Sequence, residues 1–168
     1  MFDEINSLEN KQEWQAAKDI LFKEWSKNKD DLSILIRLGT LCWYVLVFWE
    51  RINTNGANET DFYNTLDIVT SYGLDKFSDN TEFLWIFSYM ISSFPYYFGD
   101  YCEYENLAKK MIEKAHKLSP NDPLITMLLL NDESDEYYAL CKEVANSLKD
   151  RFKEDNSINR YFKNVFDC

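Results

Sequence analysis

The chain has 168 residues, of which 46% are hydrophobic and 17% aromatic, and its 18 basic and 29 acidic residues give a net charge of −11. This composition can fill the core of a domain, which argues against a disordered chain, and the charge disfavours nucleic acid and anionic membranes as partners. With 4 Gly and 3 Pro, the chain has too few turn residues for a β-sandwich or barrel. Helices joined by short polar loops are expected.

The N-terminal third predicts two helices separated by a polar turn. Residues 10–27 carry four apolar side chains at the 3–4 spacing of one helical face, namely Trp14, Ala17, Leu21 and Trp25. Asp31 is positioned to cap a second helix over residues 32–51, which is apolar nearly all round, as in a helix buried on several sides. Residues 44–48 are β-prone when taken alone, so a short strand is the alternative there.

The middle of the chain predicts two further helices with different endings. One is expected over residues 60–72 after an Asn-rich loop, and Gly73 is expected to end it. The other is expected over residues 82–94 after the turn-forming sequence Ser-Asp-Asn-Thr, and Pro95 interrupts the pattern. The longest apolar runs of the chain fall short of the ~20 residues that cross a bilayer, so these runs are expected to be buried helices.

The C-terminal part predicts four more helices, over residues 103–118, 124–130, 137–153 and 157–166. The chain then has about eight helices, and no segment gives a convincing strand. Short connections place consecutive helices side by side and antiparallel. The expected fold is therefore all-α: a single domain, residues 1–168, of stacked antiparallel helical hairpins.

Two alanines seven positions apart, Ala108 and Ala115, flank Ile112 in the helix expected over residues 103–118, and Ser-Pro-Asn follows its end. This pattern resembles the second helix of a tetratricopeptide repeat, in which small residues let neighbouring helices approach closely. Residues 35–42 resemble the first helix of that repeat. The matches depart from the usual period of 34 residues, so the resemblance implies a degenerate array; an irregular bundle with one similar hairpin is the alternative.

The resemblance also implies a concave groove, which in this family is lined by the first helix of each hairpin and holds a peptide or a protein surface. The positions that align with the groove face are Ile36, Thr40, Trp43, Tyr44, Glu82, Trp85 and Tyr89. Of these, Trp43, Tyr44, Glu82, Trp85 and Tyr89 are the predicted partner-binding residues, because Trp and Tyr make strong anchors when a partner desolvates them. The alternative for Trp43 and Trp85 is an ordinary core position.

No pattern of residues points to catalysis, a cofactor or a metal. The single histidine, His116, lies near a helix end with no nucleophile spaced to use it. The four cysteines are widely separated without a Cys-x-x-Cys pair, and the glycines form no phosphate loop. The start of the sequence lacks the basic residues and apolar run of a signal peptide, so we expect reduced thiols and a cytoplasmic protein.

An acidic segment near the C-terminus carries four carboxylates: Asp132, Glu133, Asp135 and Glu136. It lacks the Gly and the alternating ligands of a calcium loop. The segment is expected to be either a solvated loop or part of a landing site for a basic partner, which the net charge would attract.

These observations favour protein binding over catalysis. The first hypothesis is a bacterial immunity protein that binds a basic, nuclease-type toxin and neutralises it by occlusion, because proteins of that class are often compact, acidic and poor in motifs. The alternative is a tetratricopeptide-type chaperone that holds an extended segment of a secreted or assembly protein. An enzyme with an unrecognised carboxylate site is the third hypothesis. No nucleic acid, membrane or small-molecule partner is expected.

Overall fold

The computed structural model describes residues 1–130 and 134–167. Every regular element within these residues is helical, which confirms the predicted all-α class and excludes the alternative of a strand at residues 44–48. The elements, with η marking 3-10 helices, are α1 (Phe2–Asn10), α2 (Trp14–Lys27), α3 (Leu32–Val47), η1 (Trp49–Arg51), α4 (Glu59–Lys76), α5 (Thr81–Ser93), η2 (Pro95–Tyr97), α6 (Tyr101–Leu118), α7 (Pro123–Leu129), α8 (Asp135–Arg151) and α9 (Ser157–Phe166).

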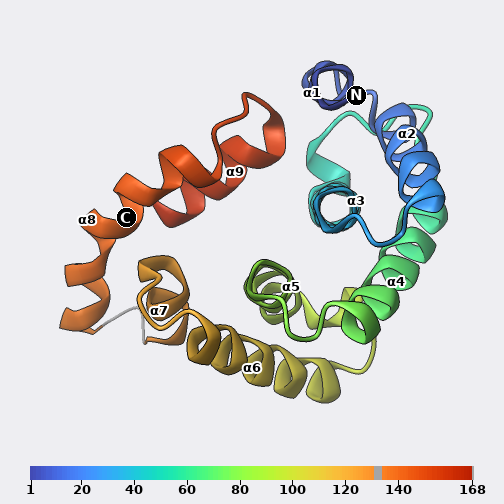
Figure 1. Ribbon diagram of the computed structural model, residues 1–168. Coiled ribbons are helices and arrows are strands. Elements are labelled where there is room, and N and C mark those ends of the chain that lie inside the picture. The colour runs from blue at the N-terminus through green and yellow to red at the C-terminus, as the bar shows by residue number, and fades with distance from the viewer. Residues whose placement is uncertain (131–133, 168) are drawn as a thin grey trace.

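The helices stack as hairpins in two curved layers (Figure 1). Helices α2, α4 and α6 form the outer side of the arc, while α3 and α5 lie inside it. Helix α3 packs on both α2 and α4, and α5 packs on α6. The last helix, α9, lies on the concave side in contact with α1 and α3. The chain therefore covers part of its own inner face.

Polar caps and a proline fix several helix boundaries. Asp31 caps α3 by accepting hydrogen bonds from the backbone N–H groups of Ser33 and Ile34, as the sequence predicts. These N–H groups have no partner within the helix, so the cap stabilises its first turn. The predicted interruption at Pro95 is also confirmed, because α5 ends at Ser93 and Pro95 begins η2.

Three predicted boundaries are wrong. The sequence predicts the first helix from residue 10, whereas α1 precedes it and a turn at Gln12, with φ 59°, separates α1 from α2. The single helix predicted over residues 32–51 ends at Val47 and is followed by η1. Gly73 does not end α4, which continues to Lys76. For Gly73 the reason is tertiary packing, because Phe83 of α5 lies where a side chain at this position would stand.

Gly39 and Gly73 serve helix packing. A Cβ atom on Gly73 would lie 2.2 Å from Cε2 of Phe83, and one on Gly39 would lie 2.6 Å from Cζ of Phe87. The Phe83 and Phe87 rings stack on each other with centroids 4.4 Å apart. Helix α5 therefore places the Phe87 ring against Gly39 of α3 and the Phe83 ring against Gly73 of α4. This close approach explains why α3 and α4 each contain a glycine.

The small residues of α6 act in the same way. Ala108 and Ala115 are buried, and the Ser88 hydroxyl of α5 donates a hydrogen bond to the carbonyl oxygen of Ala108 at 2.8 Å. The close approach that the sequence predicts for this hairpin is therefore present.

Among the described helices, none combines the length and the apolar character that a membrane span requires.

Candidate functional site

A groove of about 780 Å³ opens on the concave side, between α3, α5 and the segment that joins α8 to α9. Its apolar lining comprises Phe2, Leu32, Ile36, Trp85, Ile86, Phe152, Ile158 and Phe162. Its charged lining comprises Asp30, Asp31, Arg37, Glu82, Arg151, Lys153 and Glu154. The lining thus combines apolar walls with charged groups, and binding sites commonly use polar groups within apolar walls to orient a ligand.

The structure divides the predicted groove residues into two groups. Ile36, Thr40, Glu82 and Trp85 line the groove. Trp43, Tyr44 and Tyr89 lie on the same inner face but under α9. The first group therefore faces the open part of the concave side, and the second faces the chain's own last helix.

Trp43 is a core residue. Its side chain is fully buried, and its ring centroid lies 5.6 Å from that of Tyr161 and 6.3 Å from that of Phe162, both on α9. Tyr44 also packs edge-on against Tyr161, with centroids 5.8 Å apart. The Tyr89 hydroxyl lies 2.9 Å from the Tyr161 hydroxyl. The aromatic face of α9 therefore occupies the position that a bound partner would need to reach these three residues.

Trp85 is almost fully buried yet forms part of the groove wall. Its indole N–H donates a hydrogen bond to Oε2 of Glu82 at 2.8 Å, and the Arg151 guanidinium lies 5.1 Å from its ring centroid. This geometry is a cation–π contact. Glu82 and Arg151 therefore fix the Trp85 ring at the edge of the groove.

Arg151 joins three helices at this edge. Its Nη2 atom lies 2.5 Å from Oδ2 of Asp122 and 3.3 Å from Oε1 of Glu82. Burial alone would lower the pKa of Arg151, but the two carboxylates outweigh burial and raise it. Asp122 also caps α7 by accepting hydrogen bonds from the backbone of Leu124 and Ile125. The α8 side of the groove is thus tied to α5 and α7 by charged contacts.

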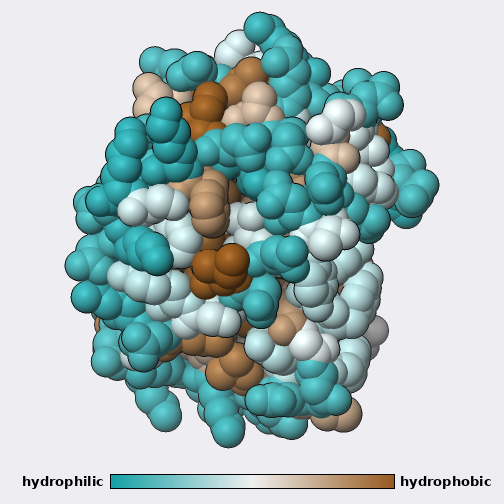
Figure 2. Space-filling model, turned by 90° about the vertical axis from the view of Figure 1, so that its right-hand side faces the viewer, coloured by the Kyte–Doolittle hydropathy of each residue, from teal (hydrophilic) through white to brown (hydrophobic). Residues whose placement is uncertain are grey.

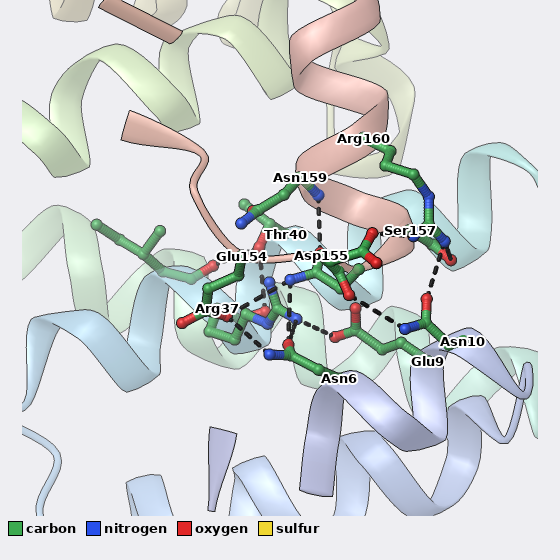
Figure 3. A network of polar contacts seen from close by, with 12 residues as sticks. Asn6, Glu9, Asn10, Arg37, Thr40, Glu154, Asp155, Ser157, Asn159 and Arg160 are labelled. Carbon is green, nitrogen blue, oxygen red and sulfur yellow. Dashed lines mark hydrogen bonds and ion pairs between the residues drawn. The ribbon is translucent and has the colours of Figure 1, made fainter. Parts of the chain in front are cut away.

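A second polar network lies beside the groove and joins α1, α3 and the α8–α9 connection (Figure 3). Glu9 is fully buried, and its Oε1 atom lies 2.7 Å from Nη2 of Arg37. Arg37 also donates a hydrogen bond to Oδ1 of Asn6 at 2.8 Å, and that same oxygen accepts a hydrogen bond from the Asn156 side chain at 3.0 Å. Asn6 and Arg37 therefore hold the α8–α9 connection against α1 and α3.

Glu9 is electrostatically unusual. Burial raises the pKa of its carboxyl to about 7, although the neighbouring Arg37 acts to lower it. The contact with Arg37 is close enough for an ion pair but lacks hydrogen-bond geometry, and neither carboxylate oxygen of Glu9 has a hydrogen-bond partner among the described residues. We therefore regard burial as the stronger influence on this carboxyl.

The described residues of the predicted acidic segment, Asp135 and Glu136, are not part of the groove lining. Asp135 and Glu136 are exposed in the first turn of α8, where carboxylates are favourable. Asp132 and Glu133 lie outside the described residues. The structure therefore brings neither Asp135 nor Glu136 together with the predicted residues Glu82 and Trp85.

The cysteines differ from the prediction in one respect. Cys42 is a buried thiol and Cys102 an exposed one, whereas Cys141 is disulfide-bonded. A disulfide is not typical of a reducing compartment, so the cytoplasmic placement stays a prediction. Within residues 1–130 and 134–167, no group of three or more His, Cys, Asp or Glu side chains is placed to hold a metal ion.

Sequence reasoning missed the half of the site that α1, α8 and the α8–α9 connection provide. Arg37 could have been noticed, because it is the one charged residue of the apolar helix α3. The short apolar spacing of Phe2, Ile5 and Leu8 was the available signal for α1. No local pattern marks Phe152 or Glu154 as groove residues, since they reach α3 and α5 through the tertiary fold.

Comparison with protein-family models, with curated protein sequences and with solved structures finds no match to this chain. The groove and the surface charge are therefore the features of this chain that bear on its function.

Proposed function

We propose that this protein binds a basic protein toxin through the groove on its concave side and neutralises the toxin by occlusion. The observation that carries the proposal is the open, apolar groove between α3, α5 and the α8–α9 connection. Beside it, α9 packs Tyr161, Phe162 and Phe166 on the same concave face. An apolar segment of a partner could pack next to α9 in a similar manner.

The charge of the chain supports a basic partner. The net charge is −11, and four carboxylates line the groove: Asp30, Asp31, Glu82 and Glu154. Three cations, Arg37, Arg151 and Lys153, also line it; Arg37 is paired with Glu9, and Arg151 is paired with Asp122 and with Glu82 of the lining. Opposite charge raises the rate at which two proteins meet, and fast capture suits a protein that must act before a toxin does.

The position of α9 favours a toxin-binding role over a chaperone role. A chaperone that holds an extended segment needs a groove that continues along the array. Here α9 covers Trp43, Tyr44 and Tyr89, and the open groove measures about 780 Å³. A groove of this extent suits one protruding segment of a folded partner.

Capture and growth assays with a groove variant test the proposal. The purified chain is used as bait in a lysate of its source cells, and any basic protein recovered is produced alone and together with the chain. The Ile36→Arg variant places a cation in the groove. The Leu118→Arg variant is the matched control, because Leu118 is exposed at the end of α6 and outside the groove lining.

The expected result is a recovered protein that stops growth when produced alone and is harmless with the wild-type chain or Leu118→Arg, but not with Ile36→Arg. Rescue by both variants would remove the groove from the interface. Recovery of a harmless apolar protein that is unstable without this chain would replace the toxin proposal with the chaperone one.

A further inference from the structure

The surface charge of the chain is unevenly distributed. Residues 52–108 contain nine acidic residues and one basic residue, Lys76. Lys76 pairs with Asp30, which lies outside this stretch, at 3.3 Å. Glu59, Asp67 and Glu103 form no ion pair among the described residues, so the surface of α4 and the start of α6 carries uncompensated negative charge.

The same surface exposes large aromatic side chains. Tyr63 on α4 is 41% exposed, Tyr96 on η2 is 56% exposed and Tyr101 on α6 is 54% exposed. Glu59, Tyr63 and Asp67 follow at four-residue intervals on α4 and therefore share one face of that helix. Figure 2, which views the α2 and α4 side of the molecule, shows mainly hydrophilic surface broken by small apolar patches.

Helix α4, η2 and α6 lie next to one another, because η2 packs on α6 and Glu59 of α4 lines one hollow with Tyr97 of η2. Burial raises the pKa of Tyr104 on α6, and Asp67, Glu103 and Tyr63 add to that effect. Burial likewise raises the pKa of Tyr97 on η2 to about 12, with contributions from Tyr96 and Glu59. Carboxylates and tyrosines from the three elements are thus close enough to influence one another.

We propose that this region is a second docking surface, which receives a Lys- and Arg-rich patch of a protein partner. It consists of Glu59, Tyr63, Asp67, Tyr96, Tyr101 and Glu103 and is called the acidic tyrosine face below. This inference rests on the proposed function and deepens it, because it names where the positive charge of the partner lies. The groove takes an apolar segment, and the acidic tyrosine face takes the cationic surface.

The chemistry of the face fits Lys and Arg side chains in two ways. The carboxylates offer ion pairs to a cation, and the tyrosine rings offer cation–π contacts together with a large contact area at low entropic cost. Exposed Tyr side chains are common anchors of protein interfaces. Arg51 lines a hollow together with Glu59, and no ion pair joins Glu59 to a cation among the described residues.

Binding of a fluorescein-labelled decaarginine peptide, followed by fluorescence anisotropy at low and physiological salt, tests the inference. The face variant carries Glu59→Gln, Asp67→Asn and Glu103→Gln. Its matched control carries Glu113→Gln, Glu143→Gln and Asp150→Asn, which change the net charge equally at exposed positions of α6 and α8. Circular dichroism is used to check that both variants are folded.

The face variant should bind the peptide about tenfold more weakly than wild type, and the control variant less than about threefold, because charges beyond about 10 Å are screened. Equal losses in both variants would show that net charge alone attracts the peptide and would overturn the inference, as would an absence of peptide binding to wild type at low salt.

The tyrosines are tested separately with Tyr63→Ser and Tyr101→Ser. Each change should weaken binding about five- to tenfold, the usual loss for a truncated interface anchor, and should leave the salt dependence unchanged. Unchanged affinity in both would overturn the aromatic part of the inference. Ile36→Arg should bind the peptide as wild type does, within about twofold, because Ile36 lies in the groove. The peptide assay therefore tests the acidic tyrosine face separately from the groove, so a wrong proposal for one surface can be told from a wrong proposal for the other.

Discussion

Replacing Glu9 by Gln should make the protein more stable at neutral and alkaline pH. Glu9 is fully buried between α1 and α3 and faces Arg37 on α3, Glu154 on the α8–α9 connection and Arg160 on α9. Burial raises the pKa of its carboxyl from 4.5 to about 7. The folded protein therefore favours the protonated form, which Gln mimics in shape and charge.

The size of the effect follows from the pKa. A folded-state pKa above the unfolded value gives a contribution to stability that is fully present below pH 4.5 and is lost as the pH rises through about 7. A shift from 4.5 to about 7 corresponds to about 3 kcal/mol of unfolding free energy. Relative to wild type, Glu9→Gln should therefore gain up to about 3 kcal/mol between pH 4.5 and pH 8.

Urea denaturation of both proteins, followed by circular dichroism across this pH range, measures that difference. Carboxylates other than Glu9 titrate in both proteins and cancel to a first approximation. Asn6→Ala serves as the control, because it removes a hydrogen-bond partner of Arg37 without removing a titrating group. If Glu9→Gln instead loses stability relative to wild type as the pH rises, the ion pair with Arg37 outweighs burial and the reasoning is refuted.

Two further predictions concern packing. Gly73→Ala should lower the unfolding free energy by about 1–3 kcal/mol, because the added Cβ would lie 2.2 Å from Cε2 of Phe83. The double variant with Phe83→Leu should lose less unfolding free energy than the sum of the two single changes. Strict additivity of the two losses in urea denaturation would contradict the proposed contact. Phe162→Ala should cost about 3–5 kcal/mol, because Phe162 is buried and stacks on Phe152 with centroids 5.2 Å apart. Val165→Ala, an exposed change on the same helix, should cost about 0.5 kcal/mol or less, and a similar cost for both changes would show that α9 is not packed on the concave face.

The sequence by itself determined the local structure and part of the site. Asp31 and Pro95 mark helix boundaries because a cap and a missing N–H act within a few residues of the chain. Helical spacing and the family resemblance placed Ile36, Glu82 and Trp85 on the inner face, and all three line the groove. Such features depend on residues that are neighbours in sequence, so a single helix is enough to reveal them.

The tertiary structure decided the features that depend on distant residues. Helix α4 continues past Gly73, and the glycine makes room for the Phe83 ring that packs beside it. Trp43 is buried because α9, more than a hundred residues later in the chain, packs against it. Glu9 acquires a raised pKa because α1 places it in the interior beside Arg37. No periodicity within one helix reports which other helix will cover it, and burial by that helix sets packing, charge and access to the groove.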